Sequence, residues 1–313
     1  MTPFFSVIIP LYNKEKYIQN TLNCVFNQSF DNFEVIVVND GSTDRSLELL
    51  EEFSDHRLKI IHQKNQGVSV ARNTGMENAK ADYICFLDAD DTWKENHLKA
   101  FYDTIAKFPD PKMYCGRYVT QISKNTFIEN RFIDIPENYE GYVTDFFKSS
   151  LINRVALTSA VCIHKDIFNE IGGFDPTLKS DQDLDYWIKI ALKYKIVITA
   201  ENTMVYNFIN TNKSLSKDQS KFNKLTNLNQ YFEIEKSNES LKLFLDVYRI
   251  EYGLNYHILG LKEQSLEYLK YVDQKNINFK TKLLFKLPPF VLRLMLRTKQ
   301  NLRNYGIDFT VYH

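Results

Sequence analysis

The first 110 residues alternate between short runs of consecutive apolar residues and longer segments in which apolar residues recur at helical spacing. The apolar runs lie at 5–10, 33–38, 58–62 and 83–87, and helical spacing follows at 16–28, 44–53 and 68–79. Strands that are apolar throughout are buried on both faces, and strands separated by helices pair in parallel. The sequence therefore predicts an α/β fold with a mixed, mostly parallel sheet flanked by helices.

The rest of the chain has a different pattern. A length of 313 residues predicts about two domains. Residues 111–216 hold less regular strand-like pieces, whereas from 217 onward the pattern is helical and rich in Leu, Tyr, Lys and Glu. We therefore expect one domain over 1–216, with halves at 1–110 and 111–216, followed by a C-terminal helical region over 217–313.

Composition excludes several classes of protein. The chain has 39 Lys and Arg against 39 Asp and Glu, and 44% of its residues are hydrophobic. This is a globular composition with no general attraction to nucleic acid, so no nucleic-acid partner is expected. No signal peptide and no membrane-spanning run is expected, and four cysteines without CxxC spacing predict reduced thiols in a cytoplasmic protein. These cysteines are Cys24, Cys85, Cys115 and Cys162.

The C-terminal region contains one strongly basic segment. Residues 275–305 hold eight Lys or Arg and no acidic residue, with Leu and Phe interleaved, and Arg293, Arg297 and Asn301 recur at helical spacing. A basic amphipathic helix can lie on an anionic membrane surface, which predicts membrane contact through 280–305. A terminal helix that packs on its own domain and exposes its basic face to water is an equally good interpretation.

Acidic residues gather where predicted strands or turns end. Asp40 and Asp44 follow the second strand, and a further group follows the fourth, at Asp88, Asp90 and Asp91. Ligands of open α/β sheets bind at the carboxyl ends of the strands. One Asp could cap a helix that begins near Trp93, but three carboxylates in four residues repel one another unless a cation lies among them. The second group therefore predicts a metal or phosphate site, whereas Asp40–Asp44 alone is typical of a turn.

The motifs together resemble the family-2 inverting glycosyltransferases with the GT-A fold, a Rossmann-like α/β fold. The resemblance covers residues 4 to about 216, with the motifs in family order. The matching segments are 6–13 (SVIIPLYN), 38–44 (VNDGSTD), 66–75 (QGVSVARNTG), 86–91 (FLDADD), 172–175 (GGFD), 182–187 (QDLDYW) and 214–216 (SLS).

The resemblance implies roles for individual residues. The 1–110 half would bind a UDP-sugar donor and the 111–216 half a saccharide or lipid-linked acceptor, in cell-surface polysaccharide assembly. Asp90 would hold a divalent cation, Mn²⁺ or Mg²⁺, and Asp183 would be the catalytic base. The residues implied for the nucleotide-sugar site are Pro10, Leu11, Tyr12, Asp40, Arg72, Asp88 and Ala89.

This chain departs from the family pattern at two places. Gln182 stands before Asp183 where relatives commonly have Glu, so activity is expected with altered acceptor contacts. Relatives often carry a His before the Ser-x-Ser element, and 207–213 has none, which leaves Asn210, Thr211 or Lys213 for phosphate contact. For Arg72 a salt bridge on the surface of its helix is an alternative to a role in donor binding.

Two other functions fit part of the pattern. A nucleotidyltransferase shares the α/β sheet and acidic site, but usually has a Gly-rich loop after the first strand, and this chain has Pro-Leu-Tyr-Asn-Lys there. The second alternative is a non-catalytic relative that binds a sugar nucleotide or a glycan. The presence of Asp40, Asp88, Asp90 and Asp183 argues against it.

Overall fold

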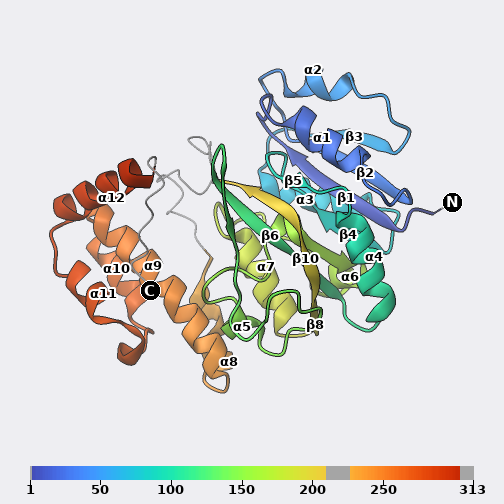
Figure 1. The fold of residues 1–313 in the computed structure, drawn as a ribbon. Coiled ribbons are helices and arrows are strands. Elements are labelled where there is room, and N and C mark those ends of the chain that lie inside the picture. The colour runs from blue at the N-terminus through green and yellow to red at the C-terminus, as the bar shows by residue number, and fades with distance from the viewer. Residues whose placement is uncertain (1, 209–225, 304–313) are drawn as a thin grey trace. The chain divides into compact units, whose positions relative to one another are not determined.

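The computed structural model describes residues 2–208 and 226–303, which form two compact units (Figure 1). The α/β unit holds the chain up to Ile122 and Phe127–Thr226, and the helical unit holds Ser123–Thr126 and the chain from Asn227. The boundary expected between residues 216 and 217 falls within 209–225, outside the described residues, so it stays a prediction.

The α/β unit is built on one mixed sheet, with the strand order β3-β2-β1-β4-β9-β6-β10-β5 among the described residues. In its first part, β3, β2, β1 and β4 are neighbours and run parallel. In the second part, β9 is antiparallel to β4 and to β6. The strands are β1 Phe5–Leu11, β2 Phe33–Asn39, β3 Leu58–His62, β4 Tyr83–Phe86, β5 Thr92–Trp93, β6 Met113–Ser123, β7 Thr126–Glu129, β8 Gly141–Tyr142, β9 Val161–His164 and β10 Ile196–Asn207.

Burial explains why the sequence forms this sheet. All seven residues of β2 are buried, and β1 leaves only Pro10 partly exposed, as expected for strands covered on both faces. The helices that accompany the sheet are α1 Ile18–Phe26, α2 Ser46–Glu51, α3 Val68–Glu77, α4 His97–Lys107, α5 Phe146–Ser149, α6 Asp166–Ile171 and α7 Gln182–Ala191, with a 3-10 turn, η1, at Thr158–Ala160. The predicted α/β sheet flanked by helices is confirmed.

Helix α3 packs directly on β1, and it carries Gly75 where the two elements meet. A Cβ atom at this position would collide with the side chain of Ile8 on β1. The glycine therefore lets α3 pack against β1 and β2. This packing determines how far from the sheet Arg72 lies, because Arg72 is one turn earlier on α3.

The structure corrects the prediction for the segment after the second acidic group. The segment after Asp91 does not begin a helix near Trp93; Thr92 and Trp93 form the short strand β5, and α4 begins at His97. Strand β5 pairs antiparallel with β10, which no local pattern in the sequence indicates. The indole of Trp93 is buried and donates a hydrogen bond to the carbonyl of Ser159 at 2.6 Å.

The helical unit is organised around a long helix, α9, on which α10 packs. Its elements are a 3-10 turn η5 at Leu228–Tyr231, α8 Phe232–Glu235, α9 Glu239–Leu259, α10 Lys262–Leu269, a 3-10 turn η6 at Gln274–Asn276, α11 Phe279–Leu284 and α12 Pro289–Arg303. None of the helices in the described ranges 2–208 and 226–303 is long and apolar enough to cross a membrane.

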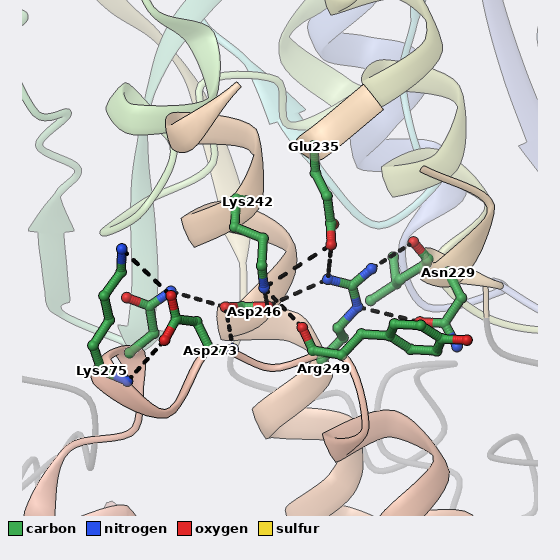
Figure 2. A network of polar contacts seen from close by, with 10 residues as sticks. Asn229, Glu235, Lys242, Asp246, Arg249, Asp273 and Lys275 are labelled. Atoms are coloured by element: carbon green, nitrogen blue, oxygen red, sulfur yellow. Dashed lines mark hydrogen bonds and ion pairs between the residues drawn. The ribbon is translucent and has the colours of Figure 1, made fainter. Parts of the chain in front are cut away.

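A buried ionic network joins the start of the helical unit to α9 (Figure 2). The Arg249 guanidinium is fully buried and donates to both oxygens of Glu235, at 3.0 and 2.8 Å, and to Asp246 at 3.3 Å. It also donates to the carbonyl of Leu228 at 3.1 Å. Burial raises the pKa of Glu235, and the Arg249 charge opposes that rise. The network holds η5 and α8 against the long helix.

Candidate functional site

The ends of three parallel strands place the first candidate residues at one edge of the sheet. In the register of the sheet, Leu11 of β1 pairs with Asn39 of β2, and Ile8 of β1 pairs with Phe86 of β4. The residues that come next, Tyr12, Asp40 and Asp88, therefore leave the sheet at the same edge. This is the edge at which open α/β sheets bind their ligands.

The loops that follow β1 and β2 hold each other in place. Asn13 has φ +51°, a left-handed conformation that Asn tolerates, and its side-chain oxygen accepts hydrogen bonds from the backbone N–H of Thr43 at 2.8 Å and of Asp44 at 3.3 Å. In return, Asp44 accepts from the N–H of Glu15 at 3.1 Å. Of the residues implied for the nucleoside pocket, Leu11 is buried beneath these loops, Pro10 is half-buried and Tyr12 is 46% exposed.

Asp40 is buried and shapes the loop before α3. Its carboxylate accepts hydrogen bonds from the side chain of Gln63 at 2.7 Å and from the backbone N–H groups of Gln66 and Gly67, both at 2.8 Å. A carboxylate offers about four acceptor positions, so these three donors leave about one for a ligand. Asp40 therefore builds the site and can make at most one further contact in it.

Arg72 is buried across the sheet edge rather than exposed on the surface of its helix. Its guanidinium donates to Asp88 at 2.6 Å and lies 5.1 Å from the ring centroid of Phe174. This geometry contradicts the surface salt bridge considered for Arg72. Its Nε and Nη1 atoms are buried and make no hydrogen bond within the described residues, although most buried donors are paired. The unused N–H groups are suited to an incoming anion.

Asp88 and Asp90 are each paired with a basic side chain. Asp88 is paired with Arg72, and its side chain is 34% exposed. Asp90 forms an ion pair with Lys14, with side-chain exposures of 23% and 27%. Ala89 between them is buried, and its carbonyl accepts from the hydroxyl of Thr21 at 3.0 Å. Lys14 was not singled out from the sequence, although its place directly after β1 puts it at the edge where the acidic residues gather.

Asp91 has a structural role that separates it from its two neighbours. It is buried, and its carboxylate accepts from the hydroxyl of Ser159 at 2.6 Å and from the backbone N–H of Asn207 at 3.0 Å. Burial, with Asp90 and Asp88 nearby, raises the pKa of Asp91 well above its usual range. Asp91 thus ties the acidic loop to the end of β10, and the partly exposed carboxylates of the loop are those of Asp88 and Asp90.

The acidic loop fits a divalent cation only if the substrate completes the coordination. Within 2–208 and 226–303, no group of three or more His, Cys, Asp or Glu side chains is placed to hold a metal ion. Mg²⁺ in nucleotide sites commonly takes one or two carboxylates and fills its shell with phosphate oxygens and water. Asp90, with a partly exposed carboxylate, meets that requirement. Asn210, Thr211, Lys213 and the Ser-x-Ser element at 214–216 lie outside the described residues.

Asp183, the expected base, lies in the first turn of α7 and is held by three groups. The Arg154 guanidinium pairs with its carboxylate at 3.1 Å, the Thr158 hydroxyl donates to the same oxygen at 3.5 Å, and the backbone N–H of Leu184 donates to the other at 2.9 Å. Asp181, just before the helix, has φ +55°, which is a strained conformation for this residue. The N-terminus of α7 and the Arg154 guanidinium both place positive charge beside the Asp183 carboxylate.

The turn η1 connects Asp183 with the acidic loop. Thr158 contacts Asp183, and the next residue, Ser159, donates to Asp91 and accepts from the backbone N–H of Asp88 at 3.0 Å. Two consecutive residues therefore hold both acidic elements of the candidate site. No sequence pattern indicates this role, because Thr158 and Ser159 belong to no motif and acquire it only through tertiary contacts.

Comparison with known proteins identifies relatives of this chain. The profile of glycosyl transferase family 2 matches residues 6–172. Glycosyltransferase GlyG of Streptococcus pneumoniae serotype 4 is 27% identical over 303 residues, which cover 91% of this chain and 97% of GlyG. The minor teichoic acid biosynthesis protein GgaA of Bacillus subtilis is 31% identical over 207 residues, 61% of this chain and 44% of GgaA. Matches to two other glycosyltransferases, 43% and 47% identical, cover only 15% and 28% of those proteins.

Solved structures show the same fold. The crystal structure of S. aureus TarS 1-349 in complex with UDP-GlcNAc aligns with a TM-score of 0.63 at 19% sequence identity, covering 87% of this chain and 82% of that one. This likeness identifies the GT-A fold that the motifs imply. With the family profile matching more than half of the sequence, the chain belongs to glycosyl transferase family 2.

Proposed function

We propose that the protein transfers a sugar from a UDP-linked donor to a saccharide or lipid-linked acceptor, with inversion at the anomeric carbon. The observation that carries the proposal is the junction at η1, where Thr158 contacts Asp183 and Ser159 contacts the loop of Asp88 and Asp91. A carboxylate suited to accept a proton and a loop suited to a diphosphate are therefore held by neighbouring residues.

Each group has a defined task in a single displacement. Asp183 removes the proton of the acceptor hydroxyl, while Arg154 and Thr158 orient its carboxylate. Arg72 offers its unused N–H groups to the charge that develops on the leaving diphosphate. A Mn²⁺ or Mg²⁺ ion held by Asp90 would supply Lewis-acid stabilisation of that leaving group. One displacement inverts the anomeric carbon, so an α-linked donor yields a β-linked product.

The comparisons support the substrate class. TarS, which shares the fold, was crystallised with UDP-GlcNAc, and GgaA is named for teichoic acid biosynthesis. We therefore place the donor among UDP-sugars and the acceptor in cell-surface polysaccharide assembly at the cytoplasmic face of the membrane. A nucleotidyltransferase is disfavoured because the residues after β1, Tyr12-Asn-Lys14, include no glycine.

The test separates binding from catalysis. A panel of UDP-sugars is incubated with the wild type, Asp183→Asn and the control Asp103→Asn, which changes an exposed carboxylate on α4. We expect UDP release by the wild type and the control, loss of about 10²–10⁴-fold in Asp183→Asn, and UDP affinity within a few-fold for all three. Proton NMR of the first sugar released should show the β anomer from an α-linked donor.

Other outcomes identify the alternatives. UDP binding without turnover by the wild type, with every UDP-sugar and with added saccharide acceptors, would favour the non-catalytic binding relative. Release of the α anomer first would contradict a single displacement. Full activity of Asp183→Asn would show that another group accepts the proton.

The basic segment of the helical unit is proposed to bind an anionic membrane. Its apolar side chains are exposed among the basic residues: Phe279 is 81% exposed, Phe290 66% and Leu294 64%. Lys282 and Lys286 are exposed beside them. Apolar side chains that insert among lipid headgroups, with each nearby cation contributing about 1 kcal/mol, suit a surface of anionic lipid. This would bring the enzyme to a lipid-linked acceptor.

Vesicle sedimentation tests this surface. The wild type should bind vesicles of phosphatidylcholine with phosphatidylglycerol, more weakly at high salt, and should not bind pure phosphatidylcholine. Phe290→Ser with Leu294→Ser should abolish binding, while Leu266→Ser, which changes a side chain that is 56% exposed outside the basic segment, should not. If the wild type does not bind these vesicles, or if Leu266→Ser loses as much binding as the double variant, the basic face is exposed to water and has no role in membrane binding.

A further inference from the structure

Lys14 forms an ion pair with the Asp90 carboxylate, which is the group expected to bind a divalent cation. Its ammonium pairs with Asp90, while its backbone N–H donates to the hydroxyl of Ser46 at 2.7 Å. Its carbonyl accepts from the N–H of Ile18 at 3.0 Å, at the start of α1. The backbone of Lys14 is therefore fixed on two sides, and only its side chain, which is partly exposed, is able to change partner.

The acidic loop is thus balanced by cations that belong to the chain itself. Arg72 neutralises Asp88 and Lys14 neutralises Asp90. The two pairs differ, because Arg72 is buried with two donors left over, whereas the Lys14 ammonium is partly exposed. Arg72 can add a ligand without leaving Asp88, but Lys14 competes with any cation that approaches Asp90.

We propose that Lys14 is a diphosphate-binding residue that exchanges Asp90 for the donor's phosphate oxygens when a divalent cation takes its place. The proposal rests on the proposed function. A compact, charged ammonium on a flexible stem is suited to such an exchange, and the nearest new anion is the diphosphate itself. Free of nucleotide, Lys14 keeps the acidic loop neutral and in place.

This exchange couples the two ligands. A cation that binds alone must displace Lys14 and leave its charge without a partner, which weakens cation binding. A diphosphate that binds at the same time receives the freed ammonium, so each ligand raises the affinity for the other by the same factor. Uridine monophosphate, which lacks the second phosphate, should gain less from Lys14 than UDP does.

Calorimetric titration of Lys14→Met tests the exchange, with Lys16→Met as the matched control. Lys16 carries the same charge two residues later and is exposed. In Lys14→Met we expect Mn²⁺ alone to bind more tightly, and UDP in the presence of Mn²⁺ to bind about 10- to 100-fold more weakly, the effect of one charge-assisted hydrogen bond. Uridine monophosphate affinity should change less than UDP affinity, and Lys16→Met should match the wild type.

The remaining outcomes would overturn the inference. Tighter binding of both Mn²⁺ and UDP would show that Lys14 only competes for Asp90. An equal loss for uridine, uridine monophosphate and UDP, with a lower melting temperature, would show a structural role. Unchanged UDP binding would exclude a contact with the diphosphate. If the wild type binds no UDP under any condition, the proposed UDP-sugar donor is wrong, and the inference about Lys14 is wrong with it. The wild-type titration alone distinguishes this outcome from the others.

Discussion

His97 makes the stability of the α/β unit depend on pH in a way that can be calculated. It is 1% exposed, its Nδ1 lies 2.7 Å from the Thr203 hydroxyl, and its Nε2 is buried without a partner among the described residues. Burial lowers the pKa of His97 to about 3. The ring stacks on Trp93 at 4.3 Å, and Trp93 in turn donates to Ser159, which contacts the acidic loop.

The sign and size follow from proton linkage. Because the folded pKa lies below the unfolded value of about 6.5, the unfolded chain binds more protons in between. The stability that neutral His97 contributes is complete above pH 6.5 and is lost as the pH falls toward 3. Each pH unit in this window costs about 1.4 kcal/mol, so lowering the pH from 7 to 5 removes about 2 kcal/mol from the free energy of unfolding.

Urea unfolding followed by tryptophan fluorescence measures this loss of stability in the α/β unit. Both tryptophans of the chain, Trp93 and Trp187, lie in the α/β unit. The variant His97→Asn can keep a polar contact with Thr203 but does not titrate in this range. The wild type should lose about 2 kcal/mol more than the variant between pH 7 and pH 5. His164, whose pKa burial also lowers, contributes equally to both proteins and cancels in the difference. An equal loss in both proteins would refute the assignment to His97.

Three further perturbations test other parts of the structure. Arg249→Met removes the two hydrogen bonds to the buried Glu235 carboxylate, leaving it the Lys242 ammonium at 3.9 Å, and should lower the melting temperature of the helical transition, at a cost of about 3–5 kcal/mol; an unchanged transition by circular dichroism would contradict the network. Gly75→Ala should cost about 1–3 kcal/mol in urea unfolding, because its Cβ meets Ile8, and a neutral result would show that α3 can move away from β1 without penalty. Arg72→Lys should weaken UDP binding about tenfold in calorimetry with little change in melting temperature, since a lysine presents its donors from one nitrogen and lacks the separate Nε and Nη1 atoms that Arg72 keeps free while Nη2 pairs with Asp88; equal affinity would argue against contact with the ligand.

The parallel half of the sheet could be predicted from the sequence, because strands buried on both faces, such as β1 and β2, are apolar along most of their length. It also located Asp88 and Asp90, since acidic residues after a strand stand out in an apolar neighbourhood. Short strands such as β5 lack any pattern of their own: Thr92 and Trp93 are extended because β10 pairs with them. The helix expected near Trp93 was wrong for this reason.

The side-chain contacts that assemble the site could not be predicted from the sequence. Asp91 looks like Asp90 in the sequence, and only its burial against Ser159 and Asn207 gives it a structural role. Lys14 and Arg154 are ordinary surface residues by pattern, yet each pairs with a carboxylate that the motifs had identified. Such roles depend on segments far apart in the chain, which neither spacing nor periodicity reports.

The central claim is that Asp88 and Asp90 form the diphosphate end of a donor site. Titration of UDP into the wild type, with and without Mn²⁺, and into Asp90→Ala and the control Asp103→Asn tests it most directly. We predict binding in the micromolar range that requires Mn²⁺, is lost in Asp90→Ala and is unchanged in Asp103→Asn. Equal UDP binding by Asp90→Ala and the wild type would contradict the claim, as would the absence of UDP binding by the wild type with either metal condition.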